Sequence, residues 1–110
     1  MFKIFQLPSL KDRCDDYFAS TDPRIVADRD VKFFHGSEAY LPEMFKFFVH
    51  VSDIDAVDLN QVFHIGNVGP EEKISRHAPM RSVSVGDLVV TEDGSHFMCD
   101  NVGWTKVEVA

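Results

Sequence analysis

The clearest alternation of hydrophobic and polar residues runs from Met44 to Ser52, where the sequence reads MFKFFVHVS. Side chains of a β-strand point to its two faces in turn, so every second residue shares a face. One face would carry Phe45, Phe47, Val49 and Val51. The other would carry Lys46, Phe48, His50 and Ser52. The pattern predicts a strand over residues 44–52, with Phe47 near the centre of the core.

A helix is predicted after this strand, because the period of the apolar residues changes from two to that of a helix. The apolar residues at helical spacing are Leu59, Val62 and Phe63. Asp55 would cap the first turn, and Gly66 or Asn67 would end the helix in the left-handed conformation. The short connection after Ser52 would fold the helix back over the face that carries Phe47.

Three shorter elements are predicted in the N-terminal part. Alternation over residues 2–5, stopped by Pro8, predicts a first strand, and VKFF at residues 31–34 predicts another. Ser9 is a suitable N-cap for a helix to about Ala19, whose apolar residues at helical spacing are Leu10, Cys14, Tyr17 and Phe18. The turn-rich, charged residues 20–30 are expected to form a loop with one helical turn at most.

The C-terminal residues are typical of a three-stranded antiparallel meander. Gly86 and Asp87 form a turn between short apolar runs, Asp93-Gly94 is a strong hairpin signal, and Gly103 separates the last two strands. The residues of the apolar runs around the first turn are Val83, Val85, Leu88 and Val90. Residues 66–82 contain glycine and prolines without a sustained period, so they are expected to form a long connection.

Together these elements predict a single α+β domain over residues 1–110. Two short helices would pack on one face of a mainly antiparallel sheet that ends in the meander. A chain of 110 residues that is 45% hydrophobic can bury a core of this kind. An edge strand of the sheet could pair with a second copy, so a homo-oligomer stays an open prediction.

The charge balance and the N-terminus narrow the location and the partners. Eighteen acidic and eleven basic residues give a net charge of −7, which disfavours non-specific attraction to nucleic acid or anionic membrane. The N-terminal residues MFKIFQLP do not resemble a secretory signal, and no apolar run approaches the ~20 residues that span a bilayer. The sequence therefore predicts a soluble, cytoplasmic protein, with Cys14 and Cys99 as buried thiols.

No metal, cofactor or catalytic residue is predicted. His96 and Cys99 have the spacing of metal ligands, but residues three apart point to opposite faces of a strand. The other histidines are dispersed singly along the sequence. Both cysteines lie in apolar patterns that favour inert thiols, no G-x-S-x-G occurs, and the paired carboxylates are typical of capping and solvated positions.

One local basic stretch stands out in the acidic chain. Its residues are Lys73, Arg76, His77 and Arg81, with no acidic residue up to Gly86. Its plainest role is to keep an exposed loop soluble, and the alternative is a patch that faces phosphate or carboxylate. Trp104, the single tryptophan, could stack on a base beside this patch, or it could anchor the core.

Several motifs in the C-terminal 60 residues or so carry a resemblance. They are Phe63-x-x-Gly66-Asn67, Arg81-Ser82-x-Ser84-Val85-Gly86-Asp87, Gly94, Cys99 and Gly103-Trp104. With them the chain resembles a group of small proteins encoded by bacteriophages and mobile elements, and loosely the C-terminal region of YodL-like domains. The resemblance implies a viral or mobile-element origin and expression in a bacterial cytoplasm. It implies no activity and no site residue, and it does not extend to the first 43 residues.

Residues and resemblance together favour a non-enzymatic accessory or binding module that acts on a host or phage protein. The first alternative is a nucleic-acid-binding module that uses the basic stretch and Trp104. The second alternative is a small enzyme, for which the sequence offers no constellation of residues.

Overall fold

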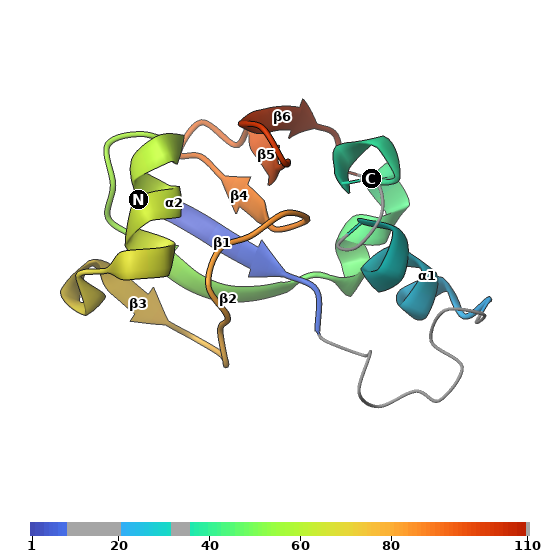
Figure 1. Ribbon diagram of the computed structural model, residues 1–110, viewed down its shortest axis with the longest axis horizontal. Helices are drawn as coiled ribbons and strands as arrows, with labels where there is room; N and C mark the ends of the chain where they lie inside the picture. Colours follow the sequence, from blue (N-terminus) through green and yellow to red (C-terminus); the bar gives the residue numbers. More distant parts are fainter. Residues whose placement is uncertain (9–20, 32–35, 110) are drawn as a thin grey trace.

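The structure is a computed structural model that describes residues 1–8, 21–31 and 36–109. Six strands form one sheet in the order β3-β2-β1-β4-β5-β6, and each pair of neighbours is antiparallel (Figure 1). The strands are β1 (Phe2–Gln6), β2 (Val49–Ile54), β3 (Ile74–Arg76), β4 (Leu88–Val90), β5 (His96–Cys99) and β6 (Trp104–Val107). The α+β class is confirmed, and β4–β6 are the expected C-terminal meander.

The helical elements lie at two ends of the sheet (Figure 1). Helix α2 (Leu59–Val68) crosses one face, and α1 (Pro23–Arg29) lies at the opposite end. The 3₁₀ segments are η3 (Gly36–Glu38), η4 (Pro42–Phe47) and η5 (Glu71–Lys73). Within the described residues, no helix has the length and apolar content that crossing a bilayer requires.

The core consists of two clusters on opposite faces of β1. Ile4 packs toward α2 with Val62 and Ile65, whereas Phe5 packs with the side chains of the second cluster. That second cluster contains the buried residues Leu7, Val31, Tyr40, Phe48, Leu88 and Met98. Since successive residues of a strand point to opposite faces, the central strand contributes to both clusters.

The turns of the meander are those that the sequence predicts. In the β4–β5 turn, the Thr91 amide donates to the Ser95 carbonyl (2.9 Å), and Gly94 has φ +87°. In the β5–β6 turn, the Asp100 amide donates to the Gly103 carbonyl (3.0 Å), and Gly103 has φ +73°. Glycine adopts these positive φ values without steric cost, which fixes both turns locally.

The prediction of a strand from Met44 is wrong. Residues 42–47 form η4, and β2 begins only at Val49. Pro42 stands at the start of η4, where its fixed φ suits a helical first turn and its missing N–H costs nothing. The phenylalanines of this run fit helical spacing as well as alternation, so the local pattern did not separate the two structures.

The expected core position of Phe47 is therefore also wrong. Phe47 lies in η4, is partly buried, and packs against the cluster on the face away from α2. The deeply buried phenylalanine of this run is Phe48, 8% exposed, which alternation had placed on the outer face. The residue of β2 that meets Val62 and Ile65 of α2 in one cluster is Val51.

Strand β2 contains a β-bulge. Ile4 pairs with Ser52 and Phe5 pairs with His50, so Val51 is an extra residue without a partner of its own on β1. A bulge reverses the phase of the alternation that follows it. As a result His50 and Asp53, three residues apart, lie on the same face of the sheet.

Helix α2 forms where the sequence predicts a helix, but its ends differ. Asp58, not Asp55, is the N-cap, and its carboxylate accepts a hydrogen bond from the Gln61 amide (2.8 Å). The helix continues beyond Gly66 and is capped by Gly69. Its buried residues are Val62 and Ile65, whereas Phe63 of the expected stripe is 43% exposed.

Two elements were missed by the sequence patterns. Residues 23–29, expected to be a loop, form α1, which is capped by Asp22 and has Pro23 in its first turn. The expected connection over residues 66–82 contains β3, which pairs with β2. The helix expected from Ser9 to Ala19, the cysteine within it and most of the strand expected at 31–34 lie outside the described residues.

Candidate functional site

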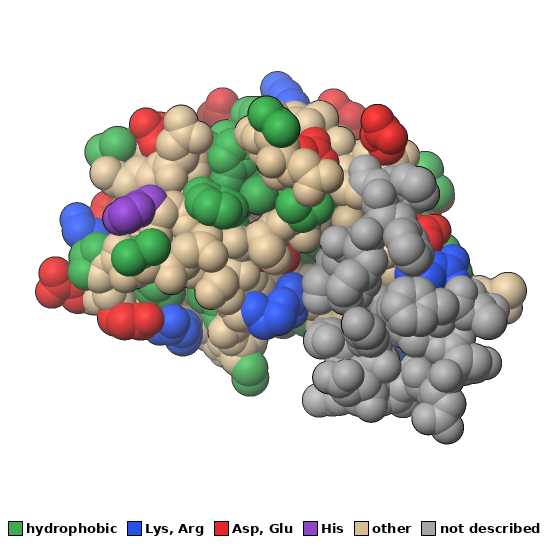
Figure 2. All heavy atoms as spheres, viewed as in Figure 1, with side chains coloured by type: hydrophobic (Ala, Val, Ile, Leu, Met, Phe, Trp, Pro, Cys, Tyr) green, Lys and Arg blue, Asp and Glu red, His purple; other side chains and the backbone are tan. Residues whose placement is uncertain are grey.

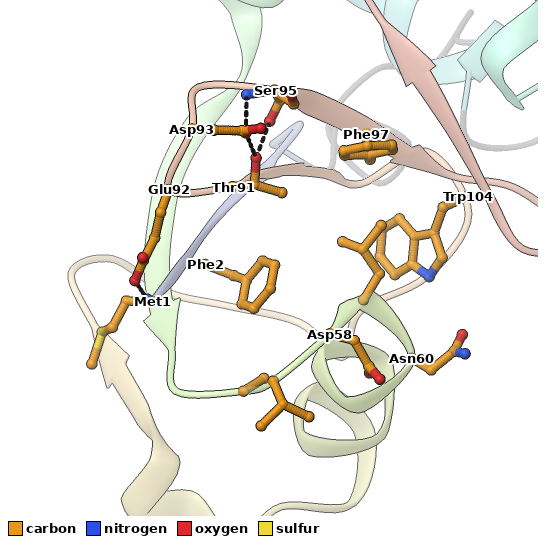
Figure 3. A pocket seen from close by; sticks show the side chains of 13 residues that line it. Met1, Phe2, Asp58, Asn60, Thr91, Glu92, Asp93, Ser95, Phe97 and Trp104 are labelled. Atoms are coloured by element: carbon orange, nitrogen blue, oxygen red, sulfur yellow. Dashed lines mark hydrogen bonds and ion pairs between the residues drawn. The ribbon is translucent and has the colours of Figure 1, made fainter.

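A hollow of about 810 Å³ lies where the start of β1, the start of α2 and the meander meet (Figure 3). Its volume falls within the ~300–1,000 Å³ that is typical of ligand sites. The lining residues are Met1, Phe2, Ala56, Val57, Asp58, Leu59, Asn60, Thr91, Glu92, Asp93, Ser95, Phe97 and Trp104. These residues come from four parts of the chain that only the folded sheet brings together.

The walls of the hollow are mainly apolar. The rings of Phe2, Phe97 and Trp104 surround the same space, each from a different strand (Figure 3). Phe2 and Trp104 are partly buried against the core below α2, so their inner edges are held by packing. Figure 2 shows hydrophobic side chains gathered between α2 and strands β4–β6 on this side of the molecule.

Val57 is the most exposed apolar side chain of the hollow. It precedes α2 and is 80% exposed, although it borders an apolar surface. A single exposed valine is ordinary, but a valine at the mouth of an apolar hollow extends a continuous patch. A ligand that filled the hollow would remove both Val57 and the apolar walls from water.

The rim of the hollow is acidic, because Asp58, Glu92 and Asp93 all line it. Asp58 is held by its capping role, and Glu92 pairs with the N-terminal ammonium. The hydrogen bonds that Asp93 accepts from Thr91 and Ser95 lower its pKa, so it is ionised at neutral pH. The rim therefore presents carboxylates held in fixed positions beside apolar walls, with the charge of Glu92 balanced by the ammonium of Met1.

The basic stretch proposed from the sequence is paired with carboxylates in the structure. Lys73 lies 3.6 Å from a carboxylate oxygen of Asp55, and Arg76 makes a bidentate pair with Glu71. The hydrogen bond from Arg76 lowers the pKa of Glu71, as expected for such a pair. These carboxylates precede the stretch in sequence, so inspection of residues 73–86 alone did not reveal them.

Trp104 does not lie beside the basic stretch. Arg76 ends β3 and Trp104 begins β6, and these two strands form opposite edges of the six-stranded sheet. Trp104 lines the apolar hollow instead and packs against the core. The structure therefore does not bring together the cations and the aromatic ring of the nucleic-acid hypothesis, which stays a prediction.

Arg81 and Asp87 belong to a network that fixes the start of the meander. Asp87 is fully buried, and its carboxylate accepts hydrogen bonds from Gln6 (3.0 Å), the Ser84 amide (2.9 Å) and Arg81 (3.4 Å). Arg81 also donates to the Leu7 carbonyl (2.9 Å). The motif R-S-x-S-V-G-D thus has an architectural role, in which Asp87 bonds back to a nearby amide as the turn chemistry predicts.

His96 and Cys99 lie on opposite faces of β5, as their spacing predicts. The His96 ring contacts Phe45 at 5.3 Å between centroids, whereas Cys99 borders a smaller hollow together with Trp104. Cys99 is a free, buried thiol, and burial together with Asp87 and Asp100 raises its pKa to about 11. A thiol with so high a pKa is a poor nucleophile and a poor metal ligand at neutral pH.

Two other histidines lie close together, although the sequence had suggested that they are dispersed singly. The ring centroids of His50 and His77 lie 4.9 Å apart, and both rings contact Asp53. His77 is distant from His50 in the sequence. Regular alternation would also place His50 and Asp53 on opposite faces, and only the bulge in β2 puts them on the same face. The hollow was missed for a similar reason, since its walls come from distant segments.

Comparison with protein-family models, with curated proteins and with solved structures found no match to this chain. The phage-type resemblance therefore stays a prediction.

Proposed function

We propose that this chain is a non-enzymatic accessory or binding module, of the phage type that its C-terminal motifs resemble. Its ligand is a segment of a partner protein that places a large apolar side chain in the hollow between β1, α2 and the meander. The observation that carries the proposal is the combination of apolar walls with an acidic rim.

The chemistry of the hollow indicates the composition of this segment. Phe2, Phe97 and Trp104 offer aromatic surface to an apolar anchor, and aromatic residues are enriched in protein interfaces. The carboxylates of the rim favour lysine or arginine next to that anchor. The net charge of −7 acts in the same direction over a longer range.

Nucleic acid suits this hollow less well, because phosphates would approach a rim made of carboxylates. The aromatic ring that could stack on a base is in the hollow, whereas the arginines lie elsewhere. We therefore propose a host or phage protein as the partner, and nucleic acid becomes an outcome that the experiment can distinguish.

A displayed library of random peptides, selected on the full chain, tests the proposal. We expect selected peptides to share a large apolar residue flanked by lysine or arginine. Trp104 is the single tryptophan and lines the hollow, so its fluorescence should change when a tryptophan-free selected peptide is added. Affinity should decrease with added salt, because the rim contacts are exposed to solvent.

Two exposed valines next to and within α2 provide a matched pair of variants. Val57→Arg should weaken the selected peptide at least about tenfold, whereas Val68→Arg should change its affinity less than about twofold. Val57 borders the hollow, and Val68, 74% exposed, ends α2 about 15 Å further along the helix. Selection of acidic peptides, or equal effects of the two variants, would contradict the proposal.

An oligonucleotide provides the competing outcome. A labelled single-stranded oligonucleotide should leave Trp104 fluorescence unchanged and should not displace the selected peptide. If it binds and displaces the peptide, the hollow is a nucleic-acid site and the proposal is wrong.

A further inference from the structure

Two histidines and an aspartate converge on the face of the sheet opposite α2. The Nε2 atom of His50 lies 2.8 Å from Oδ1 of Asp53, and the Nε2 atom of His77 lies 2.9 Å from Oδ2 of the same carboxylate. The three side chains can each offer one ligand atom, with all three atoms within 4.8 Å of one another. This cluster takes no part in the hollow described above.

The backbone around the cluster holds the three side chains in this arrangement. The bulge at Val51 places His50 and Asp53 on one face, as described above. His77 follows β3, and its amide donates to the Val51 carbonyl (2.8 Å), so the bulged residue also anchors the segment that carries His77. One feature of β2 thus positions all three side chains.

The His50 ring is also fixed from the side. It stacks on Phe5 with 4.9 Å between ring centroids and an interplanar angle of 19°. Phe5 belongs to the second core cluster, so the ring rests on a packed surface. A ligand whose orientation is fixed by its neighbours loses less freedom when it binds an ion.

The three side chains have the chemistry of metal ligands and are accessible from solvent. A deprotonated carboxylate and imidazole nitrogen are the forms that bind metal ions. The side chains are 34% (His50), 24% (Asp53) and 45% (His77) exposed, so an ion can reach them and can keep water in its remaining positions.

We infer that His50, Asp53 and His77 form a binding site for a divalent transition-metal ion, with Zn²⁺ as the simplest occupant. Two imidazole nitrogens and one carboxylate oxygen are a common ligand set for zinc and for iron(II). The distances between Asp53 and the two Nε2 atoms are close to the separation of adjacent ligands around such an ion. Binding would require that each imidazole present the lone pair of Nε2 to the ion instead of an N–H to Asp53, and that the ligand atoms move apart slightly from hydrogen-bond distance to admit the ion.

His96 and Cys99, which cannot share a metal ion, differ from this cluster in the strand that carries them. Those two residues lie on opposite faces because β5 is regular, whereas β2 is bulged. The ion would bridge β2 and the segment after β3, and it would thereby hold the edge of the sheet.

Calorimetric titration of zinc chloride into the full chain, freed of metal with a chelator, tests the inference. We expect one ion per chain. His77→Gln and Asp53→Asn should each weaken binding at least about tenfold, because loss of a direct ligand should cost no less than the ~10–100-fold known for residues behind the ligands. His64→Gln, at an exposed position of α2, is the matched control and should bind as the unchanged chain does.

Two further measurements separate loss of the site from loss of the fold. Circular dichroism should show that the variants remain folded, and zinc should raise the melting temperature of the unchanged chain but not that of Asp53→Asn. In the unchanged chain, zinc should shift the imidazole NMR signals of His50 and His77 and leave those of His64 and His96 in place. Absence of zinc binding, shifts confined to His64 or His96, or equal affinity in all variants would overturn the inference.

Discussion

Strands β4–β6 and strand β2 belong to one sheet but are held in place by different kinds of contact. The meander is joined by short turns whose own side chains complete them, such as Asp93 in the β4–β5 turn. Strand β2 follows the 3₁₀ segment η4, contains a bulge, and pairs with strands that come much earlier and later in the chain.

The difference shows which information each region needs in order to fold. A tight turn depends on a few adjacent residues, so a glycine or aspartate at the right position determines it. The phase of β2 depends instead on its pairing with β1, where Val51 has no partner. Local contacts therefore determine the meander, whereas tertiary contacts determine β2.

Asp87 provides the strongest test of this difference, because at Asp87 the meander depends on a distant contact, with Gln6. Asp87→Ala should destabilise the fold by about 3–5 kcal/mol, because Gln6, Arg81 and the Ser84 amide would lose a buried acceptor. Urea denaturation measures this loss. Asp93→Ala, in an exposed turn, should cost much less, and equal losses would show that the network does not hold the meander.

The 3₁₀ structure of residues 42–47 predicts which of Phe47 and Phe48 contributes more to the stability of the fold. Phe48→Ala should cost about 3 kcal/mol, since Phe48 is only 8% exposed in the second cluster. Phe47→Ala should cost about 1–2 kcal/mol, because its ring is only partly buried. Urea melts of the two variants test the order, and a larger loss for Phe47 would favour the regular strand expected from the sequence.

Gly66 links α2 to the segment that leads into the meander. A Cβ built on Gly66 would lie 2.3 Å from Cγ2 of Val83, so Gly66→Ala must displace Val83. We expect a net loss of about 1–2 kcal/mol, even though alanine favours helices over glycine by about 1 kcal/mol. Thermal denaturation checks this loss, with His64→Ala on the exposed side of α2 as the control. A gain in stability would mean that Val83 moves without cost.

Asp100 gives the smallest effect and one that depends on pH. Its carboxylate accepts hydrogen bonds from Thr105, the Ser37 amide (2.9 Å) and the Ser37 hydroxyl (2.7 Å). Burial raises its pKa, but these hydrogen bonds lower it below the usual 3.8. A carboxyl group whose pKa is lower in the folded state stabilises the fold above the unfolded pKa, and this contribution is lost as the pH falls through the folded value.

Urea melts of the unchanged chain and of Asp100→Asn at several pH values test this sign. The stability difference should be greatest above about pH 5 and should shrink below about pH 4. Ser37→Ala, which removes one donor to Asp100, should reduce the pH dependence in part. A difference that grows as the pH falls would contradict the assignment.

The elements with strong local signals could be predicted from the sequence. Gly94 and Gly103 determine their turns through positive φ values, and the helix around Val62 follows from its apolar spacing. Its ends could not be placed, because Asp55 and Asp58 are equally suitable caps from the sequence alone. Pro23 was taken as part of a loop, although a proline fits the first turn of a helix equally well.

Neither the hollow nor the histidine cluster could be predicted in the same way. Phe2 and Trp104 meet only because β1 lies in the middle of the sheet and α2 crosses it. His50 and His77 meet because β3, three residues long, pairs with a bulged strand. A strand so short has no measurable alternation, and a bulge leaves no distinctive residue in the sequence.

The central position of β1 has a consequence for the order in which the chain can fold. Strand β1 is made first during synthesis, but one of its partners, β4, lies almost a whole chain length away, with Lys3 opposite Val90. Closing so long a loop costs entropy before any contact rewards it. The pair β2–β3 and the meander can each form early as separate units, whereas the pairing of β1 with β4 has to wait until the long loop between them closes. Stopped-flow refolding should therefore show β1 acquiring its protection against hydrogen exchange no earlier than the β4–β5 turn.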